Sequence, residues 1–184
     1  GDGWTRVIAE DFEGAFPPAG WQLTNPRTPG GQFLWGKRDC RPHEGGASVW
    51  AVGGGTAGAP QQCGSTYPNG LLNFMKIGPL DLTGYADGEL QFGLWSEIEG
   101  DGAQLVDKMQ WGASLDGRLF NNYATAGFTG DWVPEWIGLN QVPYIGSVIN
   151  RSGVYLGWSF ESDVSNPQAY RGSFVDTAAL WLYR

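Results

Sequence analysis

The sequence predicts an all-β protein in which two antiparallel sheets pack face to face. No segment keeps the 3.6-residue apolar period of an amphipathic helix, whereas apolar and polar residues alternate with period two in several stretches. Gly, Pro, Asn or Asp residues bound these stretches, as is typical of strands joined by turns. The expected strands lie nearly end to end, so the helical crossovers that a parallel sheet needs are missing. We therefore expect one sandwich domain over residues 1–184.

The individual strands follow from this alternation and from the turn residues between them. The expected strands are residues 4–12, 21–24, 33–36, 48–52, 72–77, 89–97, 108–114, 119–123, 136–139, 154–161 and 173–183. In residues 89–97, Leu90 and Phe92 share one face and Gln91 shares the other with Trp95, which predicts a half-buried strand. The dipeptide Asp116-Gly117 tolerates positive φ and predicts the turn of a hairpin.

Composition and charge exclude several classes of function. Eleven Lys and Arg residues against 19 Asp and Glu residues give a formal charge of −8. This leaves no basic surface for nucleic acid or for anionic lipid, both of which are bound through Lys and Arg clusters. No apolar run approaches the roughly 20 residues that cross a bilayer, so we expect no membrane insertion. The lack of an initiator Met leads us to expect a mature product or a domain excised from a longer polypeptide.

The two cysteines predict a disulfide bond. Cys40 and Cys63 enclose the Gly-rich, irregular residues 41–62, where a cross-link would reduce the entropy of the unfolded chain most usefully. The alternative is a pair of buried free thiols in a cytosolic protein. An acidic, aromatic-rich chain with Gly loops and a disulfide is typical of secreted proteins, so we expect an extracellular or cell-surface location.

Several short motifs are similar to one family. EDFEG at residues 10–14, FPP at 16–18 and GW at 20–21 resemble the opening of MAM-like and cleaved-adhesin jelly-roll domains of bacterial extracellular proteins, including secreted peptidases. IGPLDL at 77–82, SLDG at 114–117 and GSFVD at 172–176 resemble later strands of that family, although Thr177 replaces the second acid of its final motif. The resemblance implies a jelly-roll sandwich that serves in adhesion, in glycan binding or as an accessory module.

The same resemblance implies a calcium ion that ties the first strand to the last. Asp11 and Glu13 lie two residues apart and so point to the same side of an extended strand. The family pattern brings Asp176 beside them. Carboxylate oxygens are the ligands that calcium prefers, so these three residues are the candidate metal site. The alternative is that they are ordinary surface acids.

A second acidic run has a simpler interpretation. Glu97, Glu99, Asp101 and Asp107 lack the ligand spacing of an EF-hand, and acidic runs are usually solvated. We expect a solvated loop here.

The ten tryptophans exceed what a core of this size requires. Five match the family pattern and are expected in the core, namely Trp21, Trp35, Trp95, Trp111 and Trp158. Three other tryptophans and one tyrosine stand in loop-like, polar contexts, namely Trp50, Trp132, Trp136 and Tyr144. The polar residues near the last three are Asp131, Glu135, Asn140 and Gln141. Exposed aromatic rings stack on sugar rings while polar neighbours orient the hydroxyls, so Trp132, Trp136 and Tyr144 with Asp131 and Asn140 form the candidate glycan site. Such a patch also suits a protein partner.

Catalysis is not supported by any motif. The only histidine, His43, lies in a predicted surface loop, and neither G-x-S-x-G nor H-E-x-x-H occurs. We therefore expect a noncatalytic extracellular adhesion or carbohydrate-binding module with a structural calcium ion, whose partner is a glycan or a cell-surface protein. The alternative is a structural or protein–protein interaction domain of a secreted peptidase, bound to its parent polypeptide, or of a self-associating surface protein.

Overall fold

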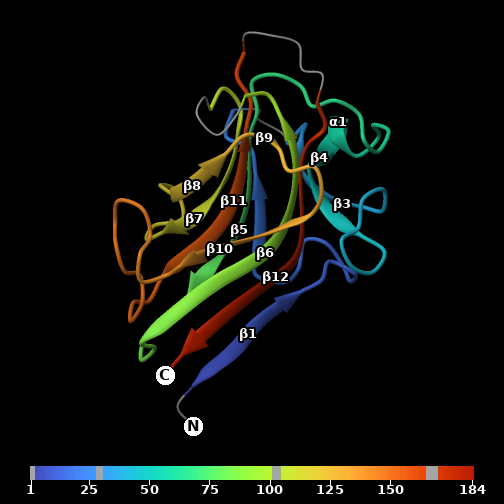
Figure 1. Cartoon of the computed structure of the whole chain (residues 1–184). Coiled ribbons are helices and arrows are strands. Elements are labelled where there is room, and N and C mark those ends of the chain that lie inside the picture. Colours follow the sequence, from blue (N-terminus) through green and yellow to red (C-terminus); the bar gives the residue numbers. More distant parts are fainter. Residues whose placement is uncertain (1–2, 28–30, 101–104, 165–169) are drawn as a thin grey trace.

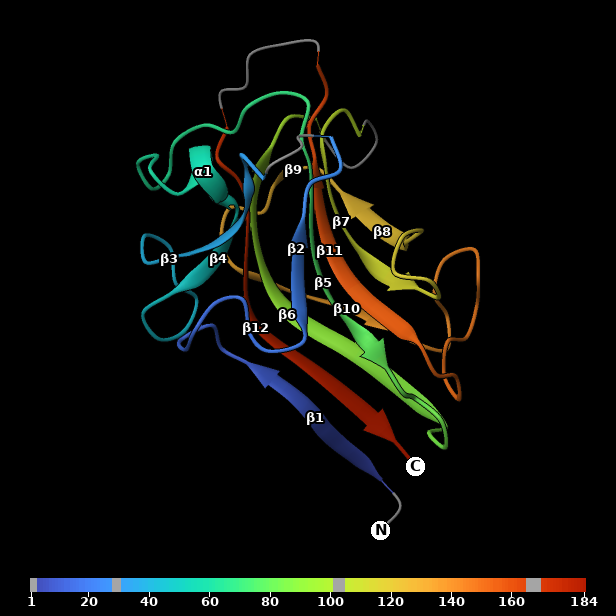
Figure 2. The same ribbon diagram turned by 180° about the vertical axis from the view of Figure 1, so that it is seen from behind.

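The computed structural model describes residues 3–27, 31–100, 105–164 and 170–184. Within these ranges the chain forms two antiparallel sheets packed face to face, with one short helix, α1 (Gly55–Gly58). In Figure 1 the larger sheet faces the viewer, and in Figure 2, the view from the opposite side, the smaller sheet does. The expected jelly-roll sandwich of two antiparallel sheets is confirmed.

The larger sheet has seven strands and carries both ends of the described chain. Five strands form its main path, in the order β10 (Val133–Gly138), β6 (Asp87–Ile98), β12 (Gly172–Tyr183), β4 (Ser48–Gly54) and β3 (Leu34–Arg38). Two more strands pair beside this path, β1 (Trp4–Glu10) against β12 and β9 (Gly127–Phe128) against β6.

The smaller sheet has five strands. Their order is β2 (Trp21–Thr24), β5 (Leu72–Leu80), β11 (Val154–Glu161), β7 (Lys108–Ser114) and β8 (Asn121–Thr125). The strands at 21–24, 108–114 and 154–161 have the expected bounds, because turn residues flank them closely. The two-residue strand β9 and the helix α1 were not expected, since neither is long enough to show a periodic pattern.

The first and last strands lie side by side, as Figure 1 shows. Trp4 of β1 faces Tyr183 of β12, and Glu10 faces Ala178. The register of β12 against β6 shifts between Asp176 and Ala179, and at this bulge the partner of β12 on its other edge changes from β4 to β1. After the bulge, β12 pairs with β1 in place of β4, so β1 is attached to the sheet through β12.

The core confirms the expected tryptophans and corrects one other. Trp21, Trp35, Trp95, Trp111 and Trp158 are all buried. Trp50, which the Gly-rich context marked as a loop residue, is fully buried in β4. Its ring stacks on Phe174 at a centroid distance of 5.5 Å, and its Nε1–H donates to the Arg171 carbonyl. The gain from burying the Trp50 ring outweighs the preference of Gly-rich sequences for exposed loops, because an aromatic ring removes a large apolar area from water.

The predicted disulfide between Cys40 and Cys63 is present, with the two Cα atoms 5.9 Å apart. It attaches the loop after β3 to the segment after α1. Among the described residues, no helix is long and apolar enough to cross a membrane.

Candidate functional site

A broad hollow lies on the outer face of the larger sheet. Its volume is about 590 Å³. We call it the aromatic hollow; it is lined by His43, Glu89, Gln91, Phe92, Gly93, Trp132, Val133, Pro134, Glu135, Trp136 and Thr177. These residues come from β6, from β10 and the residue before it, from the bulge of β12 and from the loop after β3.

Strand alternation places the polar floor of the hollow. In β6, Leu90 and Phe92 are buried, so Glu89 and Gln91 point to the opposite, outer face. The Gln91 amide donates a hydrogen bond of 2.8 Å to the Glu89 carboxylate, which fixes both side chains. Gln91 pairs with Trp136 of β10 across the sheet, so the indole stands beside this polar pair.

Trp136 is the most exposed aromatic residue in the hollow. Its side chain is 57% exposed, and its backbone carbonyl accepts a hydrogen bond of 3.1 Å from the buried Trp111 indole. The backbone is thus anchored while the ring is offered to solvent. Glu135, another lining residue, pairs with Phe92 across the two strands, and partial burial raises the pKa of its carboxyl.

The other wall of the hollow is a stack of two rings. The imidazole of His43 lies against the indole of Trp132, with centroids 5.0 Å apart and planes 23° apart. Gly93 makes room for this stack, because a Cβ atom there would lie 3.0 Å from His43 Cδ2 and 3.2 Å from Thr177 Oγ1. A side chain at Gly93 would therefore enter the hollow.

The loop that carries His43 is held by a buried carboxylate. Asp176 Oδ2 accepts the backbone N–H groups of His43 and Glu44 at 3.0 and 3.1 Å, and Oδ1 accepts that of Thr177 at 2.8 Å. Burial raises the pKa of Asp176, and these three hydrogen bonds act in the opposite direction. Asp176 thus fixes the position of one wall of the hollow.

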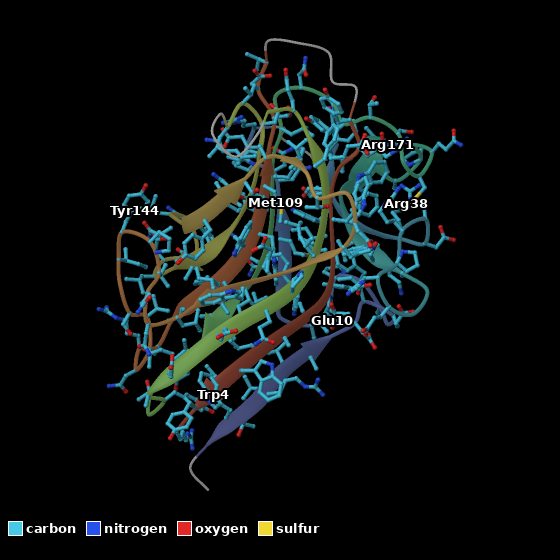
Figure 3. All side chains as sticks on the ribbon, in the orientation of Figure 1. Trp4, Glu10, Arg38, Met109, Tyr144 and Arg171 are labelled. Atoms are coloured by element: carbon cyan, nitrogen blue, oxygen red, sulfur yellow. A yellow bond between two sulfur atoms is a disulfide. The ribbon has the colours of Figure 1, made fainter. Side chains whose placement is uncertain are left out.

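The structure brings together part of the predicted glycan site. Trp132 and Trp136 both line the aromatic hollow. Asp131 immediately precedes Trp132, and its carboxylate accepts a hydrogen bond of 2.7 Å from the Trp132 N–H, but Asp131 does not line the hollow. Two predicted residues lie elsewhere. The Asn140 amide donates a hydrogen bond to Asp87, and Tyr144 is 96% exposed. Figure 3 shows Tyr144 on a separate loop.

Several lining residues were missed from the sequence. Glu89 and Gln91 were detectable, because the alternation in residues 89–97 assigns them to the outer face. His43 lies in a surface loop, as expected, but no sequence pattern pairs it with Trp132, which lies 89 positions away in the chain. That contact depends on the path of the loop.

The three predicted calcium ligands all bind backbone N–H groups. Asp11 accepts the N–H of Glu13 at 3.0 Å. Glu13 Oε1 accepts those of Gly46 and Ala47 at 2.9 and 3.1 Å, in the same loop that Asp176 holds. The first strand and the last strand are therefore joined through this loop. Calcium binding by these carboxylates stays a prediction.

A different set of carboxylates converges near the other end of the sandwich. In the part of the chain that the structure describes, oxygens of Glu99, Asp107 and Asp163 lie within 4.8 Å of one another, close enough to hold a metal ion. Asp107 is fully buried and accepts the Tyr67 hydroxyl at 2.6 Å and the Asp163 N–H at 2.8 Å. Burial raises the pKa of Asp107; the hydrogen bonds from Tyr67 and from the Asp163 N–H act in the opposite direction, and the nearby charges of Asp163 and Glu99 raise it again.

This cluster corrects the expectation of a solvated acidic loop. Asp107 is buried beneath Tyr67, and one carboxylate oxygen of Glu99 is also buried. Glu97 is paired with Arg171 at 2.9 Å. Asp101 lies outside the described residues. A run of acids in sequence does not reveal that Tyr67, from a distant loop, covers one of them.

The fold and the hollow define a jelly-roll domain with an aromatic surface site. No protein family and no curated protein matches the sequence. Solved structures do match its fold. A cleaved adhesin domain of Lys-gingipain from Porphyromonas gingivalis has a TM-score of 0.60 and 14% sequence identity, over 96% of this chain and 98% of that chain.

Two other similar structures are carbohydrate-binding domains. The CBM22-1 xylan-binding domain of Xyn10C from Paenibacillus barcinonensis has a TM-score of 0.56 and 10% identity, over 100% of this chain and 98% of that chain. TmCBM61, solved with β-1,4-galactotriose, has a TM-score of 0.53 and 12% identity, over 93% of each chain. At these identities the likeness establishes the jelly-roll fold.

Proposed function

We propose that residues 1–184 form a noncatalytic, extracellular carbohydrate-binding or adhesion module whose ligand occupies the aromatic hollow. One observation carries this proposal: Trp136 is exposed beside the polar pair Glu89 and Gln91 and opposite the stacked rings of His43 and Trp132. A sugar ring has an apolar face that packs on an indole and a rim of hydroxyls that needs donors and acceptors. The hollow offers both.

The similar structures support this proposal. Two of them are described as a xylan-binding domain and as a complex with a galactotriose, and each covers nearly the whole chain. The disulfide supports an extracellular location, since such bonds persist in oxidising compartments.

A glycan array with matched variants tests the proposal. We expect sugar-dependent binding by the unmodified protein and its loss in Trp136→Ala and Trp132→Ala. Tyr144→Ala is the control, because Tyr144 is exposed outside the hollow and its removal should leave binding unchanged. An array that stays blank for the unmodified protein, or binding that is insensitive to both tryptophans, would contradict the proposal.

The second candidate is a structural or protein–protein interaction domain of a secreted peptidase or of a self-associating surface protein. One observation favours it: β1 is an edge strand paired only with β12, and both Trp4 and Val7 on it are exposed. Such an edge can accept another strand. Analytical ultracentrifugation would reveal self-association, and a blank glycan array with a concentration-dependent mass would favour this candidate.

We also propose a structural calcium ion, with two sets of residues as candidates. The first is Asp11, Glu13 and Asp176, and the second is Glu99, Asp107 and Asp163. Calcium that binds the folded chain raises its melting temperature. Asp176→Asn should abolish this rise if the first set holds the ion, and Asp107→Asn should do so if the second does. Calorimetry that shows no heat and no change in melting temperature would exclude both.

A further inference from the structure

A second, smaller hollow lies directly beside the aromatic hollow. Its volume is about 300 Å³, and it is lined by Trp4, Glu89, Gln91 and Trp181. We call it the terminal hollow, because Trp4 and Trp181 belong to the first and last strands. Glu89 and Gln91 line both hollows. The two hollows are therefore continuous across β6.

The strand register explains this continuity. Trp136 pairs with Gln91 across β10 and β6, and Trp181 pairs with Glu89 across β12 and β6. All four side chains thus stand on the outer face of the sheet. At ordinary sheet spacing, Trp136 and Trp181 stand about 12 Å apart, with the polar pair between them. An aromatic ring flanks the polar pair on each side.

The aromatic surface extends to the end of the sheet. Trp4 is 48% exposed and contacts Tyr183 at a centroid distance of 5.5 Å, and the two residues face each other across β1 and β12. Figure 3 shows Trp4 at the extremity of the molecule, far from the centre of the sandwich. Core packing gives no reason for aromatic rings at this place.

The chemistry between the rings favours an uncharged ligand. Among the described residues, no Lys or Arg lines either hollow, and the polar groups there are two carboxylates, an amide, a hydroxyl and an imidazole. The guanidinium of Arg6 lies nearby, 5.8 Å from the centre of the Trp181 ring. A net charge of −8 repels polyanions. Hydroxyl-rich, neutral sugars fit these groups.

We infer that the two hollows are subsites of one surface that binds an extended, neutral polysaccharide chain, running from Trp136 over Glu89 and Gln91 to Trp181 and Trp4. This inference rests on the proposed function and adds the ligand's length, its charge and its direction across the strands. A ligand recognised only by its terminal sugar would need the aromatic hollow alone.

Calorimetry with oligosaccharides of increasing length tests the inference. The probes are the disaccharides and hexasaccharides of xylan, β-1,4-galactan and mixed-linkage β-glucan. For whichever series binds, the hexasaccharide should bind more tightly than the disaccharide. Trp181→Ala and Trp4→Ala should each weaken hexasaccharide binding about three- to tenfold and leave disaccharide binding unchanged. Trp136→Ala should weaken both.

Control variants keep the result interpretable. Trp181 is partly buried, so Trp181→Phe is made alongside Trp181→Ala and should retain most of the affinity, while Trp4→Ala changes an exposed residue. Polygalacturonate serves as the anionic probe and should not bind.

The remaining outcomes contradict either the inference alone or the proposed function as well. Hexasaccharide binding that depends on Trp136 but not on Trp181 or Trp4 would leave the proposed function intact and disprove the inference. Binding of polygalacturonate would disprove a neutral ligand. If Trp181→Ala disperses an oligomer and leaves sugar binding unchanged, this face is an interface between copies and the inference is wrong. If no sugar binds, the proposed function fails as well.

Discussion

The imidazole of His43 and the indole of Trp132 stack with their centroids 5.0 Å apart, although one belongs to the loop after β3 and the other precedes β10. The stack forms one wall of the aromatic hollow, and the buried carboxylate of Asp176 holds the loop that carries His43. The geometry of the surface site thus depends on interactions beneath it.

Filling the hollow from its floor should block the ligand without unfolding the protein. In Gly93→Val the new side chain would meet His43 Cδ2 and Thr177 Oγ1 inside the hollow. We expect at least a tenfold loss of glycan affinity, measured by calorimetry, with a melting temperature close to that of the unmodified protein. Gly14→Val is the control, because a Cβ atom there meets nothing within 4 Å. Unchanged affinity in Gly93→Val would place the ligand elsewhere.

Removing the Asp176 charge should loosen the loop that carries His43. Asn at this position keeps one acceptor oxygen, so at least one of the three backbone N–H groups loses its partner. We expect a loss of about 1–3 kcal/mol in the free energy of unfolding, with faster hydrogen exchange of the His43 and Glu44 amides. Asp39→Asn, an exposed change in the same loop, should alter neither quantity. Equal exchange rates in both variants would show that Asp176 does not anchor the loop.

Stability in the absence of divalent metal should increase as the pH falls from neutral toward about pH 4. The pKa of Asp107 is raised in the folded state, mainly by burial, so the folded chain holds the proton more tightly than the unfolded chain does. Stability therefore decreases as the pH rises from the unfolded pKa through the folded pKa. Denaturant unfolding in EDTA measures this slope.

The variant Asp107→Asn isolates the contribution of this one carboxyl to the pH dependence. Asp176 and Glu135 also have raised pKa values and keep their contributions in the variant. The free energy of unfolding of Asp107→Asn should therefore change less steeply with pH than that of the unmodified protein. Identical slopes in the two proteins would mean that ionising Asp107 does not lower the free energy of unfolding. In calcium, an ion at Glu99, Asp107 and Asp163 would reverse the trend, because the metal favours the charged carboxylates.

The disulfide should contribute both to stability and to binding. A cross-link that closes a loop of this length is worth about 3 kcal/mol, so Cys40→Ser with Cys63→Ser should unfold at a correspondingly lower denaturant concentration. Because Cys40 lies in the loop that carries His43, glycan affinity should fall too. A double variant with unchanged stability would contradict the first expectation, and one with unchanged affinity the second.

Most of the strands and the antiparallel sandwich could be predicted from local alternation and turn residues, which are read along the chain. The disulfide partners followed from there being only two cysteines, and the family resemblance assigned five tryptophans to the core. The same alternation assigned Glu89 and Gln91 to an outer face. The polar context of Trp132 and Trp136 placed them in the candidate glycan site, and both line the aromatic hollow.

The tertiary structure alone decided which distant residues share a surface. Tyr144 lies near Trp136 in sequence but on a separate loop, whereas Trp181, 45 positions further on, stands across β6 from it. Asp107 became a buried acid because Tyr67 covers it. Side chains meet according to strand order and register, and both depend on the packing of the whole sandwich, so no local pattern encodes them.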